Sequence, residues 1–296
     1  MESDRMLHPI IGDIGVKTQN EVVKEEKRLR YDNQPYGKWF ISVYKNLFTQ
    51  HPYQHTAIGK MEDLDAATLE EFLAFNKKFY NPNNAVLTVA GSIDIAETKK
   101  KIAAYFGSIP KGEAIIRNYP KEPEIRETIN AKAYDANIQL PALVMAYKTP
   151  GESSRDSQIL EMISSYLSRG KSSKLYKRMV DKEKTALSVG TYNLSDELYS
   201  PFIFFSIPMG ETSLDHLKKT IDEEIKLLQN NLIDENDYQK ILNQFESDFI
   251  RDNSSVEGIA NTLAHYYIIH GDTDLINTQI ELFRSITREE LSLIHI

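Results

Sequence analysis

The stretch that decides the fold is "DAATLEEFLAFNKKFYNPNNAVLTVAGSIDIAETKKKIAAYFG", residues 65–107. Apolar residues recur at helical spacing after Asp65, which can cap a helix, and "NPNN" then stops that helix. The run "AVLTVAG" follows directly and predicts a strand over 85–91. Asp94 can cap a further helix, which Gly107 closes. Helix, strand and helix in succession favour a mixed α and β fold.

The second half of the chain repeats this pattern. It predicts a strand over 137–150, a helix from about Ser154 to Ser168, strands over 185–194 and 201–210, and a long helix whose apolar face carries Leu217, Ile221, Ile225 and Leu228. An all-helical stretch is expected at the end of the chain.

A segment without helical periodicity separates the two halves. The run "IPKGEAIIRNYPKEPEI" carries three prolines and clusters of charge. We therefore expect an α+β protein with one domain over 1–112, a linker over 113–126 and a second domain of similar layout over 127–296.

Composition excludes several classes of function. The chain has 296 residues, no cysteine and a net charge of −8 without a basic block, which argues against a nucleic-acid partner. Any metal would need His, Asp or Glu ligands. No apolar run approaches the roughly 18 residues of a membrane span. The opening "MESDRMLHPI" also lacks the apolar core of a signal peptide.

Two neighbouring acids stand out in the run "NEVVKEEKRLRYDNQPYG" near the start of the chain. At helical spacing, Val22, Val23 and Leu29 form one apolar face, with Glu26 near its middle and Glu25 at its edge. We expect at least one of the two carboxylates to face inward. Burying a carboxylate costs several kcal/mol unless it is paired, hydrogen-bonded or bound to a metal.

Residue patterns alone give no complete active site. His51 and His55 in "HPYQH" have an i, i+4 interval, but a proline follows His51, so we favour surface loop positions over a zinc site. His265 and His270 are five apart on an expected helix and do not share a face, which favours packing or exposure. The sequence contains no G-x-S-x-G elbow and no phosphate-binding glycine loop.

Several stretches together resemble a known family. They are "TQNEVVKEEKRLRYDNQPYG", the run from "HPYQH" to "GSIPKG" that includes residues 65–107, and "RGKSSKLYKRMVDKEKTALSVGTY". In order and spacing they resemble the pitrilysin/insulinase family of inverted-zincin metallopeptidases, and most of all its bacterial processing-peptidase-like group. The resemblance runs from about Arg5 to about Glu290. It implies two homologous α/β-sandwich-type domains and a zinc-dependent endopeptidase that hydrolyses unfolded or short peptide substrates in a closed chamber.

The resemblance also suggests a role for the two acids. In the family, Zn²⁺ is held by an H-x-x-E-H helix and by a glutamate on a later helix. The segment "VVKE" matches the pattern around that glutamate, which makes Glu25 the implied metal ligand and Glu26 a neighbour that supports it. The alternative is that both are solvated helix acids paired with basic residues such as Arg30.

This sequence departs from the family pattern at both ends. It contains no H-x-x-E-H, so the resemblance implies a fragment whose first domain is truncated, with an incomplete zinc site and no catalytic residue of its own. The final "SLIHI" also departs from the expected helix, which suggests a cut or foreign C-terminus. A periplasmic or cell-envelope location is favoured over the cytoplasm.

Two further positions bear on partners. In family members whose second domain assists catalysis, an arginine and a tyrosine stabilise charge on the scissile carbonyl; the matching positions here are Val180 and Leu187. Nearby Arg178 and Tyr192 are out of register and are expected to be bystanders, Arg178 on a solvated helix face. The resemblance therefore suggests a homologous subunit that supplies both groups. The alternative function is a non-catalytic homologous subunit or peptide-binding partner of such a peptidase.

Overall fold

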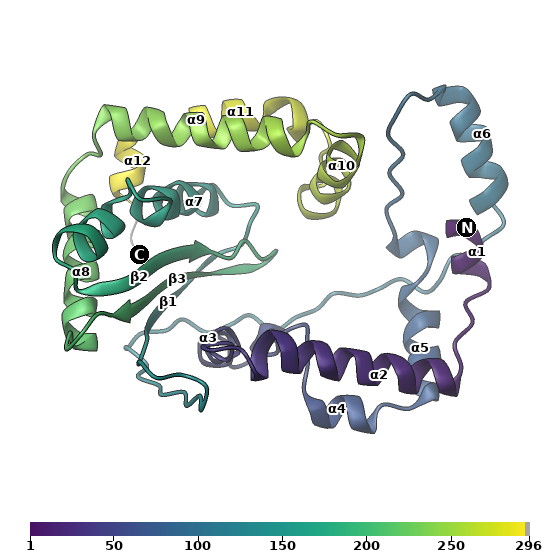
Figure 1. The fold of residues 1–296 in the computed structure, drawn as a ribbon. Helices are drawn as coiled ribbons and strands as arrows, with labels where there is room; N and C mark the ends of the chain where they lie inside the picture. Colours follow the sequence, from purple (N-terminus) through teal and green to yellow (C-terminus); the bar gives the residue numbers. More distant parts are fainter. Residues whose placement is uncertain (294–296) are drawn as a thin grey trace.

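A three-stranded antiparallel sheet organises the second half of the molecule. The computed structural model describes residues 1–293, and Figure 1 shows the helical first half beside and below this sheet. The strands are β1 (Leu143–Pro150), β2 (Ala186–Asn193) and β3 (Tyr199–Pro208), in the order β1-β3-β2. In the register of the sheet, Leu143 lies opposite Ser206 on β3, and Val189 of β2 lies opposite the same serine.

Helices account for most of the remaining chain. In the first half they are α1 (Glu2–Leu7), α2 (Asp13–Lys27) with a π-helical turn (Arg28–Asp32), α3 (Trp39–Leu47), α4 (Met61–Ala66), α5 (Leu69–Phe79) and α6 (Ile95–Phe106), with short 3₁₀ turns at Pro52–Gln54 and Pro82–Asn84. In the second half they are α7 (Arg155–Ser168), a π-helical segment (Tyr176–Lys182), α8 (Leu214–Asn230), α9 (Glu235–Asp252), α10 (Val256–His270), α11 (Leu275–Arg284) and α12 (Arg288–Leu293).

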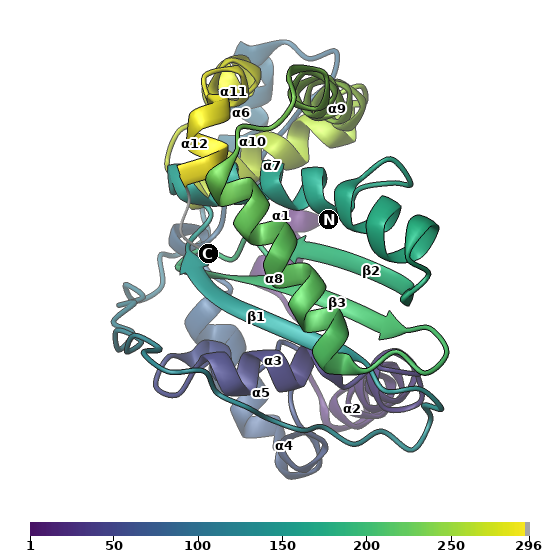
Figure 2. The same ribbon diagram turned by 90° about the vertical axis from the view of Figure 1, so that its left-hand side faces the viewer.

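The two faces of the sheet are covered by different parts of the chain. Side chains alternate along β3, so that Phe202 and Phe204 join the larger core, which also receives buried residues of α7, α8 and α9. Ile203 points to the opposite face, where it packs with buried residues of α3. Figure 2 shows α8 lying across the strands on the first of these faces, with α3 below the sheet. The sheet therefore joins both halves of the chain into one packed structure.

Local signals predicted most helices of this fold. The Asp94 carboxylate accepts a hydrogen bond from the N–H of Glu97 (2.8 Å) at the start of α6, and Gly107 follows the end of that helix. The Ser154 hydroxyl caps α7 in the same way. All four apolar residues predicted for the long helix, now α8, are buried, and the segment after it is helical over the described residues. The α+β class is confirmed.

Two local predictions are wrong. The cap of α5 is Thr68 rather than Asp65, because Thr68 and Glu71 form a reciprocal capping box. The predicted strand over 85–91 does not form, and its apolar side chains are partly exposed, with Leu87 at 48%. A strand needs a hydrogen-bonded neighbour, and the described residues 1–293 provide no strand that pairs with this segment.

The predicted linker lies within a long irregular connection between α6 and β1. One residue anchors it, because the buried carboxylate of Glu122 accepts hydrogen bonds from the backbone N–H groups of Thr49 (2.7 Å), Gln50 (2.9 Å) and His51 (2.7 Å). The Thr49 hydroxyl donates a fourth (2.8 Å). The domain limits given above remain a prediction. Of the divergent C-terminal segment "SLIHI", residues 294–296 lie outside the described residues.

Candidate functional site

Glu25 and Glu26 lie near the C-terminal end of α2 and point away from the protein. The side chain of Glu25 is 56% exposed and pairs with Arg28 (3.1 Å), and that of Glu26 is 39% exposed and pairs with Arg30 (3.2 Å). The expectation that one of these carboxylates faces inward is therefore wrong. The alternative interpretation, that both acids are solvated and pair with basic residues, predicted the i, i+4 ion pair between Glu26 and Arg30 that the structure contains.

The buried face of α2 explains this orientation. It is made by Val16, Asn20 and Lys24, not by the valines and leucine that periodicity suggested. Asn20 donates a hydrogen bond to the carbonyl of Leu64 in α4 (2.9 Å), and Lys24 forms an ion pair with Asp65. The side of α2 that faces α4 and α5 is thus the buried one, and the two acids lie on the exposed part of the helix surface.

The surroundings of Glu25 do not complete a zinc site. Across residues 1–293, Glu25 belongs to no group of three histidine, aspartate or glutamate side chains that could share one ion. His51 and His55 do not form a metal pair either. His51 is only 1% exposed, enclosed by aromatic rings such as Tyr53 and Tyr199, while His55 is exposed. The surface-loop interpretation is therefore right for His55 and wrong for His51, whose burial lowers its pKa.

The two positions implied to have lost catalytic donors lie in different surroundings. Val180 packs against the larger core, and Leu187 on β2 is 51% exposed. Arg178 is not on a solvated face, because it donates to Glu183 (2.8 Å), Glu223 (2.5 Å) and Glu224 (2.9 Å). These three ion pairs occupy its guanidinium group, and its role as a bystander stays a prediction.

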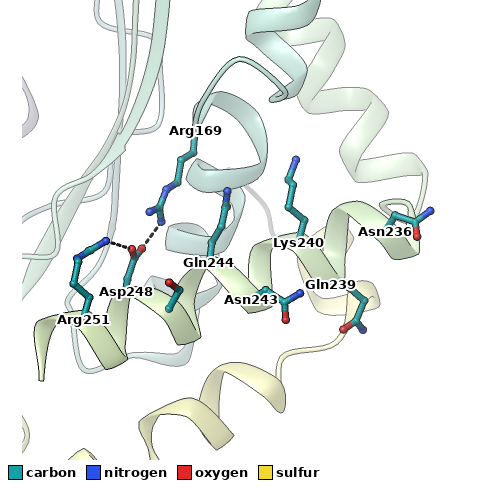
Figure 3. Close-up of a pocket in the computed structure, with 9 residues that line it drawn as sticks. Arg169, Asn236, Gln239, Lys240, Asn243, Gln244, Asp248 and Arg251 are labelled. Carbon is teal, nitrogen blue, oxygen red and sulfur yellow. Dashed lines mark hydrogen bonds and ion pairs between the residues drawn. The ribbon is translucent and has the colours of Figure 1, made fainter. Parts of the chain in front are cut away.

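An open groove of about 580 Å³ runs along α9 (Figure 3). Arg169 reaches from the end of α7 to Asp248 (2.5 Å), which also pairs with Arg251 (2.8 Å). The hydrogen bond from Arg169 lowers the pKa of Asp248, so this carboxylate stays ionised and is a poor general base. The groove is therefore a polar surface of paired charges without a nucleophile–base arrangement.

The fold creates one cluster that the sequence did not predict as a site. Glu152, His265 and His270 place one potential ligand atom each within 4.8 Å of one another. Glu152 Oε1 contacts His265 Nε2 and lies 3.7 Å from His270 Nε2. The sequence favours packing or exposure for the two histidines, and no sequence signal links them to Glu152, which lies 113 residues before His265.

Comparisons with known proteins place the chain in a family. A family model described as "Peptidase M16 inactive domain" matches residues 66–245. The chain belongs to the M16 peptidases, the pitrilysin/insulinase family. Glu25 lies outside the matched residues, so the match does not bear on its role. No helix within residues 1–293 is long and apolar enough to cross a membrane.

Individual M16 relatives agree with this assignment. The chain is 28% identical over 261 residues to a Helicobacter pylori protein named zinc protease PqqE, covering 86% of this chain but 59% of that protein, so it spans about three fifths of the relative's length. The crystal structure of a protease from Helicobacter pylori superposes with a TM-score of 0.88 at 26% identity, covering 96% of this chain and 69% of that one. A Schizosaccharomyces pombe protein named as a probable mitochondrial-processing peptidase subunit beta is 25% identical over 155 residues, covering 50% of this chain and 34% of that protein.

Proposed function

We propose that this chain is part of a zinc-dependent endopeptidase that hydrolyses unfolded or short peptides. The observation that carries the proposal is the M16 match over residues 66–245, together with the zinc protease name of the Helicobacter pylori relative. The chain itself contains no H-x-x-E-H, so the remaining zinc ligands and the catalytic glutamate would have to come from outside it. The chain should therefore be inactive alone.

Glu25 is proposed as the one ligand of the catalytic zinc that this chain contributes. Its carboxylate is exposed on a regular helix and is held only by an exposed pairing with Arg28, a type of interaction worth about 0–1 kcal/mol. A metal approaching from another segment could therefore take its place. Zinc held by three protein ligands polarises a scissile carbonyl and activates water. Glu26, which pairs with Arg30, would be a neighbour that supports the ligand from the same helix.

The edges of the sheet offer a place for an extended peptide. Within the described residues, β1 and β2 each pair on one side only, with β3. A peptide substrate could add as a further strand through main-chain hydrogen bonds, with alternate side chains giving specificity. Leu187 and Tyr192 are exposed on β2, where such a peptide would meet apolar surface.

A homologous subunit is proposed as the source of the missing donors. Val180 and Leu187 cannot donate hydrogen bonds, and Arg178 is held by three carboxylates. The name of the Schizosaccharomyces pombe relative, a peptidase subunit beta, is in keeping with such a division of labour. Loss of an oxyanion donor typically costs on the order of 10²- to 10³-fold in rate.

A second candidate function is a non-catalytic homologous subunit that binds peptides or supports a catalytic partner. The description of the matching family model as an inactive domain favours it. Under this hypothesis, neither Glu25 nor Glu26 would contribute to zinc binding in the natural protein.

The test is to express the complete natural protein that contains this chain, with Glu25→Gln and Glu26→Gln as matched variants. Zinc content by elemental analysis and hydrolysis of an unstructured fluorogenic peptide would be measured for each. We expect Glu25→Gln to lose zinc and activity and Glu26→Gln to keep most of both. Equal losses would contradict the role of Glu25, and a complete protein without H-x-x-E-H or activity would favour the non-catalytic subunit.

A further inference from the structure

The turn after β1 holds Glu152 in a defined position. Gly151 precedes it, and a Cβ at that glycine would lie 2.2 Å from the carbonyl oxygen of Glu197. Because glycine has no Cβ, the backbone at this position can approach the β2–β3 connection closely. The N–H of Glu152 then donates to the carbonyl of Asp196 (2.9 Å). Its backbone is fixed on the sheet, and its side chain, 20% exposed, extends to α10.

The two histidines come from the last turns of α10. His270 is the final residue of this helix, which Gly271 ends in the left-handed conformation (φ 70°). The side chain of His270 is 16% exposed and that of His265 is 48% exposed. Both Nε2 atoms turn to the same carboxylate despite the five-residue interval, because Glu152 lies beside the helix end.

The spacing of the three ligand atoms suits a small divalent cation. Ligands at about 2.0–2.1 Å from a tetrahedral zinc ion are separated by about 3.3 Å from each other. The Glu152–His270 separation of 3.7 Å is near that value, and all three atoms lie within 4.8 Å of one another. The contact between Glu152 and His265 is shorter, but His265 is half exposed and can rotate. Two imidazoles and one carboxylate are an established zinc ligand set.

A second carboxylate, that of Glu161, lies close enough to Glu152 to interact with it. Although part of Glu161 on α7 is exposed, desolvation by the surrounding protein and the nearby carboxylate of Glu152 raise its pKa to about 7. A cation at Glu152 would relieve this repulsion.

We propose that Glu152, His265 and His270 bind one divalent transition-metal ion of the zinc type, with water completing its coordination. The histidines of this site belong to α10, and Figures 1 and 2 show that helix apart from α2, the helix that contains Glu25; the site is therefore separate from the proposed catalytic zinc. The bound ion would cross-link two elements of the fold. Helix α10 has no buried residue, and a shared ion would tie its end to the turn between β1 and α7.

Binding is tested with the chain as it stands. Zinc binding would be measured by isothermal titration calorimetry at neutral pH, and cobalt(II) would report the coordination geometry through its visible absorption. We expect one ion per chain. His265→Ala and His270→Ala should each weaken zinc binding by more than about 100-fold, because loss of a direct ligand should exceed the roughly 10- to 100-fold cost of losing a supporting hydrogen bond.

Controls separate this site from the rest of the chain. His216→Ala removes an exposed histidine from α8, and this variant should bind zinc as the parent chain does. Circular dichroism would verify that each variant is folded. Because the side chain of His265 is half exposed, its replacement by alanine should disturb the fold little. Absence of zinc binding, or binding unchanged in the two α10 variants, would overturn the proposal. Neither outcome bears on Glu25, whose role is tested in the complete protein.

Discussion

Glu122 should be a principal anchor of the long connection between the two halves. Its side chain accepts four hydrogen bonds from the loop over 49–51, and the residue is only 4% exposed. Glu122→Gln replaces one acceptor oxygen with a donor, which leaves two groups of that loop without a partner. At about 1–3 kcal/mol for each unsatisfied donor, the loss should be roughly 2–6 kcal/mol.

The pKa of Glu122 gives an independent measure. Desolvation acts to raise this pKa, but the hydrogen bonds from His51, Gln50 and Thr49 outweigh it and lower the pKa from 4.5 to about 2. That difference corresponds to roughly 3 kcal/mol. Because the folded pKa is depressed, the stabilisation is fully present above pH 4.5 and is lost as the pH falls toward 2. By pH 3, about 2 kcal/mol of it should be gone.

Urea unfolding monitored by the fluorescence of Trp39 is a suitable assay. Trp39 is the only tryptophan of the chain. It lies on α3, the helix that precedes the anchored loop, and its ring is 5.6 Å from that of Phe205 on the sheet. At pH 7, Glu122→Gln should lower the midpoint by about 1 M urea for a slope of roughly 2–3 kcal/mol/M. The difference from the parent chain should shrink at pH 3.

A matched control lies two residues away. Glu124 is 84% exposed and has only a distant ionic neighbour, Arg126, at 3.9 Å. Glu124→Gln should therefore change the midpoint little at either pH. If the two variants unfold alike, or if the Glu122→Gln deficit is the same at pH 3 and pH 7, the hydrogen bonds to Glu122 do not hold the connection and the reasoning fails.

Two further substitutions test packing and charge in the second half. Gly151→Ala should destabilise the fold by about 1–3 kcal/mol, because its Cβ would collide with the carbonyl of Glu197. Thermal unfolding by circular dichroism would measure this loss, and an unchanged Tm would show that the turn can relax. Arg178→Ala should lower stability by leaving three carboxylates facing one another, and the loss should diminish in high salt; a loss that is independent of salt would mean that packing rather than charge is responsible.

Most of the helices and the three strands of the sheet could be predicted because their signals are local. Asp94 and Ser154 cap helices through the N–H of the residue three positions ahead, and the apolar face of α8 repeats within a few turns. The pattern over 85–91 carries the same local strand signal as β2 and β3, yet it forms no strand. Strand formation depends on a neighbour that the segment itself does not specify.

The sequence by itself determined the α+β class, the positions of most helices and membership of the M16 family, because caps, periodicity and motifs are properties of neighbouring residues. Only the tertiary structure decided which face of α2 is buried, and so left Glu25 in solvent beside Arg28. It also brought Glu152 to His265 across 113 residues of chain. Such contacts arise from how helices and sheet pack, and side-chain spacing along one helix carries no information about a partner that the fold places next to it.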